Sequence, residues 1–196
     1  MSYSPFSGNG TRMFGNNLPH SQFVPKFQKK VLTAKDEKYI LGTVGLFEEA
    51  GILLYDEEEG IASFGRFNPY PKSFDVHTTN IHGRDVEMSS ENITPLAKTQ
   101  CINLLIDLYI RMRNAGGTEF AVHVVNVEAP RPIYNTSHTY NLLARQRSNK
   151  LKGVIENRVN RWGKKAYSVE YHQGPDGFEL DTRKRRLTLI DTLRPL

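Results

Sequence analysis

Six histidines are the first side chains in this sequence that suggest chemistry, because imidazole binds transition metals and exchanges protons near neutral pH. The densest group comprises Asp75, His77, His82 and Asp85, on what the alternating pattern indicates are two strands joined by a turn. Asp75 and His77 stand two residues apart and would share a strand face, so both could bind one cation. Polar residues on the wet face of a hairpin give the same pattern, and that interpretation is favoured. We therefore predict no metal ligand and no cofactor.

Acid–base cleavage of a phosphodiester is a second possible chemistry, and it needs two histidines and a cation around one phosphate. His77 and His123 stand on separate expected strands, and a sheet could bring them together beside a lysine. No serine occupies a Gly-x-Ser-x-Gly elbow, and no glycine-rich nucleotide loop has the flanking strand and helix that it requires. A histidine- or metal-dependent nuclease is therefore kept only as an alternative, and no catalytic residue is assigned.

The single cysteine and the longest acidic run favour structural roles. Cys101 falls in an apolar helical segment, where a buried thiol is expected rather than a nucleophile. Residues 56–59 are four consecutive acids followed by Gly60. Consecutive side chains diverge at a hairpin tip, whereas a calcium loop needs alternating ligands. We expect a solvent-exposed turn at 56–60.

Positive charge is concentrated in the last third of the chain. Residues 131–196 hold 14 Lys and Arg against 6 Asp and Glu, whereas residues 1–130 hold 12 against 15. Lysine and arginine release condensed counterions from a phosphate backbone, and this effect alone supplies sequence-independent affinity. The charge distribution therefore favours a polyanionic partner.

Aromatic residues alternate with these charges, and bases stack on such side chains in proteins that bind single strands. Tyr140 and Trp162 share the apolar side of a helical segment and are assigned to the core. Tyr167 and Tyr171 share a strand face and remain candidates. The charges at 183–186 either contact phosphate or protect an edge strand from pairing. The candidate nucleic-acid-binding residues are Arg145, Arg147, Lys150, Lys152, Arg158, Arg161, Lys164, Lys165, Tyr167, Tyr171, Arg183, Lys184, Arg185 and Arg186.

These observations favour a non-enzymatic protein that binds single-stranded DNA or RNA with weak sequence preference. The alternative is a structural or assembly subunit of a virus, a phage or another homo-oligomer. Residues 1–30 read as an arm that either docks on a neighbouring copy or folds back on its own subunit. Four phenylalanines in an otherwise Gly-, Asn-, Ser- and Pro-rich segment support such docking, and they are Phe6, Phe14, Phe23 and Phe27.

The element that must position the candidate residues is a helix at about 94–114. Thr94 can cap its first turn, and Gly116 and Gly117 can end it. Its polar positions form one narrow stripe, so the helix is expected to be covered on most of its circumference. The stripe consists of Thr99, Asn103, Asp107 and Arg111.

A second, basic helical segment is expected at about 138–162, with a break at 148–149 that would make two shorter helices. The apolar run at 118–129 predicts a strand buried on both faces over part of its length. Alternation and turn residues predict further strands at 38–47, 51–55, 61–67, 73–78, 84–89, 166–172, 177–183 and 187–193.

The predicted fold class is α+β, with a mostly antiparallel sheet packed on the buried central helix and on the basic helical segment. Residues 31–196 would form one domain behind the arm 1–30. The chain has 196 residues, of which 38% are hydrophobic and 24% charged, and no apolar run reaches the roughly 18 residues of a membrane span. We predict no membrane partner and an intracellular location, in the cytoplasm or associated with a nucleoid or virion.

Overall fold

A computed structural model describes residues 21–24, 29–46, 49–69, 76–81, 84–89, 95–127, 138–163, 166–173, 175 and 177–190. The predicted α+β class is confirmed. The elements in chain order are β1 (Ser21–Phe23), β2 (Lys29–Thr33), β3 (Ile40–Thr43), β4 (Ala50–Asp56), β5 (Ile61–Phe67), β6 (Val76–Ile81), β7 (Arg84–Ser89), α1 (Pro95–Asn114), β8 (Phe120–Val125), α2 (His138–Asn160), β9 (Ala166–His172), β10 (Gly177–Asp181) and β11 (Arg186–Ile190).

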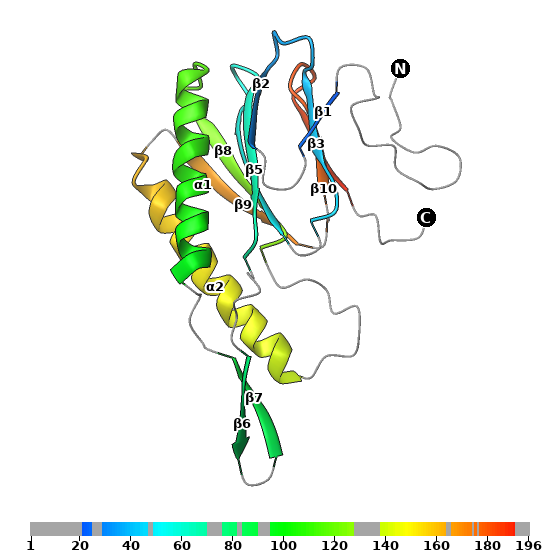
Figure 1. Cartoon of the computed structure of the whole chain (residues 1–196). Helices are drawn as coiled ribbons and strands as arrows, with labels where there is room; N and C mark the ends of the chain where they lie inside the picture. The colour runs from blue at the N-terminus through cyan, green and yellow to red at the C-terminus, as the bar shows by residue number, and fades with distance from the viewer. Residues whose placement is uncertain are drawn as a thin grey trace, which may run out of the picture.

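A five-stranded sheet in the order β2-β5-β4-β8-β9 forms the middle layer (Figure 1). Its pairings are antiparallel except for the parallel pair β8–β9. All residues of β4, β5 and β8 are buried, because the sheet is covered on both faces. In β4, Ile52 and Leu54 belong to the core on the helix side, whereas Leu53 and Tyr55 belong to the core on the opposite side.

A four-stranded sheet in the order β1-β3-β10-β11 covers that opposite side. The two sheets meet at Phe64 and Phe178, whose rings pack edge to face with centroids 4.7 Å apart. The sequence patterns pointed to one sheet, whereas β9 and β10, which follow one another in the chain, belong to different sheets. The segment between them therefore connects two layers.

Helix α1 packs against β5 from the other side, and Gly65 permits this close approach. A Cβ atom at Gly65 would lie only 2.5 Å from Leu104 of α1. The buried face of α1 includes Cys101, Leu105 and Leu108, each 0% exposed. Ile110 is 49% exposed, so the helix is covered along one face and not around most of its circumference. The cause is that α1 lies in an outer layer of the fold.

Helix α2 runs continuously from His138 to Asn160, so the expected break at 148–149 is wrong. Ser148 is 1% exposed, and it continues the buried side that Leu151 and Ile155 extend. After the helix ends, Trp162 stacks on Tyr109 of α1 with ring centroids 4.7 Å apart, which confirms its assignment to the core.

Within the described residues, no helix combines the length and apolar character needed to cross a bilayer.

The two expected hairpins are present as β4–β5 and β6–β7. The first turn closes at Gly60, which has a φ of 65°. The side chains of residues 57–59 are exposed as expected, but Asp56 is 1% exposed. Its carboxylate accepts hydrogen bonds from the backbone N–H groups of Thr118 (2.7 Å) and Glu119 (3.2 Å). Asp56 is therefore an internal link between the hairpin and β8.

Part of the expected N-terminal arm belongs to the sheets. β1 pairs in parallel with β3, and β2 pairs with β5 from Lys29 onward. Val24 is 1% exposed, and its N–H donates to the carbonyl of Gly42. Residues 1–20 lie outside the described part, so docking of the arm on a neighbouring copy stays a prediction.

Candidate nucleic-acid interface

The described cations of the last third fall into two groups. Lys150, Lys152, Arg158 and Arg161 lie on α2 or just after it, in the helical layer on one face of the five-stranded sheet. The tetrad Arg183–Arg186 lies at the turn between β10 and β11, in the sheet that covers the other face. The cations that the structure describes therefore do not form one continuous band. The side chains of Arg145, Arg147, Lys164, Lys165 and Tyr167 lie outside the described part.

The Arg183 side chain makes hydrogen bonds and a ring contact within the protein. Its Nε atom donates to the carbonyl of Ala34 (2.8 Å), and its Nη2 atom donates to the carbonyl of Asp36 (3.0 Å). The guanidinium also lies over the ring of Tyr39, 3.8 Å from its centroid. These contacts fasten the β10–β11 turn to the loop between β2 and β3.

Two neighbours of Arg183 are also engaged. The Lys184 ammonium lies 3.6 Å from the Asp181 carboxylate, and Arg185 donates to the carbonyl of Glu58 at 3.2 Å. Arg186 is exposed and begins β11, the last strand in the order of its sheet. Within the tetrad, Arg183 and Arg185 therefore join the β10–β11 turn to other turns at one end of the molecule.

The Tyr171 hydroxyl also makes its hydrogen bonds within the protein. Its hydroxyl lies 3.2 Å from the Lys152 carbonyl and 3.2 Å from the Glu156 carboxylate, and it donates to these oxygens. The Lys152 ammonium lies 5.1 Å from the centroid of the Tyr171 ring. Burial, and then the Glu156 charge and hydrogen bond, raise the pKa of the Tyr171 hydroxyl. This tyrosine is therefore packed beneath α2.

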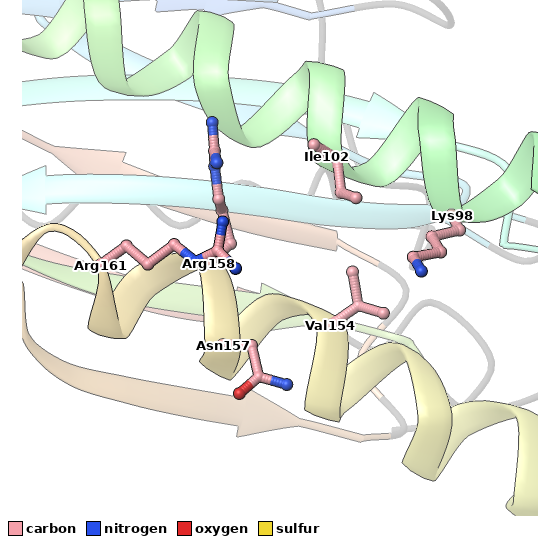
Figure 2. A pocket seen from close by; sticks show the side chains of 6 residues that line it. All are labelled: Lys98, Ile102, Val154, Asn157, Arg158 and Arg161. Atoms are coloured by element: carbon pink, nitrogen blue, oxygen red, sulfur yellow. The ribbon is translucent and has the colours of Figure 1, made fainter.

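A pocket of about 510 Å³ opens between α1 and α2 (Figure 2). Residues three, four and seven apart share one side of a helix, and four lining residues of α2 and its C-terminal turn follow this spacing. Two residues of α1, four apart, face them. We call this pocket the interhelical groove. Its lining residues are Lys98, Ile102, Val154, Asn157, Arg158 and Arg161.

The charges of the interhelical groove are unbalanced, because three cations and no carboxylate line it within the described part of the chain. Lys98 and Arg161 are exposed, whereas Arg158 is half-buried. The Nε atom of Arg158 is buried and has no hydrogen-bond partner among the described residues. A buried donor without an acceptor costs about 1–3 kcal/mol, and an anion in the groove would bring a counter-charge to the half-buried guanidinium of Arg158.

Sequence reasoning had identified Arg158 and Arg161 but not Lys98 or Asn157. On a helical wheel Arg158 falls toward the apolar side of its helix, from which its charged end must reach outward. Lys98 is a single lysine on a mostly neutral helix, so nothing local distinguishes it. Only the packing of α1 beside α2 brings Lys98 to the groove.

Of the histidine group on the second hairpin, Asp75 and His82 and the side chains of His77 and Asp85 lie outside the described part. His123 lies in β8, next to Glu170 and His172 of β9. In the described part of the chain, these three are the only group of His, Cys, Asp or Glu side chains whose ligand atoms could share a metal ion. Sequence reasoning missed this group, although Glu170 and His172 show the same two-residue spacing as Asp75 and His77.

Cys101 is fully buried against the central sheet, and burial raises the pKa of its thiol to about 12. It is therefore a structural thiol, as its position in the apolar helix indicated.

Comparison with protein-family models and with curated proteins finds no match to this chain. The geometry and charge of the interhelical groove are thus the main indications of function.

Proposed function

We propose that this protein is a non-enzymatic binder of single-stranded nucleic acid, and that the interhelical groove holds the phosphate backbone. The observation that supports this proposal is the buried, unpartnered Nε atom of Arg158 in a groove with two further cations. Arginine presents several N–H donors in a plane, which suits a phosphate group. Lys98 adds positive charge from the α1 side of the groove, and Arg161 adds it from the α2 side (Figure 2).

The lining also accounts for weak sequence preference. Ile102 and Val154 offer apolar surface, and Asn157 is the neutral polar side chain of the lining. Specific readout needs several polar groups aimed at base edges, whereas cations that contact phosphate act on every sequence alike. Binding by this groove would therefore be governed by charge and by salt.

The test is fluorescence anisotropy with a labelled single-stranded oligothymidylate. If three phosphates are neutralised, log affinity should fall with log salt at a slope of about −2, since each single-strand contact contributes about −0.7. The variant Arg158→Gln/Arg161→Gln should bind at least about tenfold more weakly and show a slope nearer −0.7.

The matched control is Lys35→Gln/Lys38→Gln, which removes the same charge from the exposed loop between β2 and β3. This control should keep its affinity within about twofold. Equal losses in both double variants would show that only net charge matters and would contradict the groove. If Lys184→Gln/Arg186→Gln abolished binding and the groove variant did not, the interface would be at the β10–β11 turn. Absence of binding at low salt would contradict the function itself.

A further inference from the structure

The parallel pair β8–β9 places three potential metal ligands on one face of the central sheet. In its register His123 lies opposite Glu170, and Val125 lies opposite His172. Side chains two residues apart share a face, so Glu170 and His172 point the same way. Val125 packs in the core between the two sheets, whereas Val124 packs on the helix side. The three ligands are therefore on the sheet face away from the interhelical groove.

The three ligand atoms are spaced as they would be around one ion. His123 Nδ1 lies 3.1 Å from His172 Nε2 and 3.4 Å from Glu170 Oε2, and the last two atoms are 3.9 Å apart. The circle through three atoms with these separations has a radius of about 2.0 Å, which is close to the bond length between zinc and a histidine nitrogen or carboxylate oxygen. A single point thus lies at bonding distance from all three atoms.

The surroundings favour the forms of these side chains that bind metals. His123 is 8% exposed, and its ring is nearly parallel to that of His172, with an interplanar angle of 23°. Burial is the largest influence on both rings and lowers the pKa of each, while the Glu170 carboxylate opposes this effect. Burial thus favours the uncharged imidazole, which is the form that binds a metal ion.

We propose that His123, Glu170 and His172 form a binding site for a divalent transition-metal ion, and that zinc fits this donor set best. Two imidazole nitrogens and one carboxylate oxygen are the ligands of a common class of zinc sites that leave a position open for water or substrate. The side chain of Glu170 is 51% exposed, so one side of the ion would face solvent. The site is independent of the proposed nucleic-acid interface, because it uses other residues on the opposite face of the sheet.

The alternative is a contact between two histidines beside a glutamate, without any ion. Calorimetric titration of chelator-treated protein with Zn²⁺ separates the two. The proposal expects one equivalent to bind with micromolar or tighter affinity, and Mg²⁺, which prefers oxygen ligands, to bind at least about a hundredfold more weakly. Co²⁺ should give visible absorption bands, and saturating Zn²⁺ should raise the midpoint of thermal unfolding by about 5 °C.

The variants Glu170→Gln and His172→Gln should each weaken zinc binding at least about tenfold and lose most of the thermal shift. Both residues lie on β9, the last strand of its sheet, so the fold should survive, as circular dichroism would verify. Glu119→Gln removes an exposed carboxylate just before β8 and is the matched control. Zinc affinity that is unchanged in both ligand variants, or absent from the native protein, would overturn the proposal.

Discussion

Arg66 holds a buried positive charge where β5 meets the end of β3. Its Nε atom lies 2.7 Å from a carboxylate oxygen of Glu49, and both side chains are at most 5% exposed. Its Nη1 atom donates to the Thr43 hydroxyl (3.1 Å) and the Val44 carbonyl (3.3 Å), and its Nη2 atom donates to the Gly45 carbonyl (3.1 Å). One guanidinium therefore ties the central sheet to a strand end of the other sheet.

Removing this guanidinium should leave a buried carboxylate without its counter-charge. We expect Arg66→Met to lower the free energy of unfolding by about 3–5 kcal/mol, because such an uncompensated charge is costly. The double variant Arg66→Met/Glu49→Met should lose less than Arg66→Met alone. Urea unfolding followed by Trp162 fluorescence measures both. If the double variant lost as much free energy of unfolding as Arg66→Met and Glu49→Met lose together when measured singly, the two charges would not interact.

At the scale of elements, the β4–β5 hairpin is fastened to β8 through Asp56. One carboxylate oxygen accepts from the N–H groups of Thr118 and Glu119, while the other accepts from the N–H group of Glu59 at 3.0 Å. These three bonds fix the turn and the start of the central strand together. The acidic run thus contains one internal anchor followed by exposed residues.

Asp56→Ala should lower the free energy of unfolding by about 2 kcal/mol, because part-buried N–H donors would lose their acceptor. Glu57→Ala removes the neighbouring acid, which is exposed, and should change stability by less than about 0.5 kcal/mol. Chemical denaturation of both variants gives the comparison. Equal effects would mean that the carboxylate of Asp56 is no more important than an exposed one.

Elements with local signals were predictable from the sequence, and those that depend on distant pairing were not. The hairpin that closes at Gly60 and the helix that ends before Gly116 follow from residues within a few positions of each other. The separation of β9 from β10 follows from the layering of two sheets, which periodicity does not encode. Likewise His123 and His172 are 49 residues apart, and only the parallel pairing of β8 with β9 brings them together.

At the scale of the molecule, the five-stranded sheet separates two chemically different faces. The interhelical groove lies on the face that α1 and α2 cover, and the His123 group lies on the other. Arg158 was predictable as a candidate because its place on a helical wheel is a property of α2 alone. The division of the basic residues into two groups was not, because it depends on which sheet β10 and β11 join.

Because β4 and β5 contribute side chains to both cores, we expect the two layers to unfold as one cooperative unit. The single thiol can report on this. Cys101 lies in the helix-side core with a pKa of about 12, so at pH 8 it should resist alkylation until the protein unfolds. The variant Cys101→Ala/Ala62→Cys moves the thiol to the core between the sheets, where Ala62 is 0% exposed.

Alkylation of both proteins across a urea series should give midpoints that coincide with the Trp162 fluorescence transition of the same protein. A shared midpoint is expected because opening either core would expose the buried face of the same central sheet. The relocated thiol would react at lower urea than the fluorescence change if the four-stranded sheet could detach alone. That outcome would contradict cooperative unfolding and would mean that the four-stranded sheet opens independently of the five-stranded sheet that α1 and α2 cover.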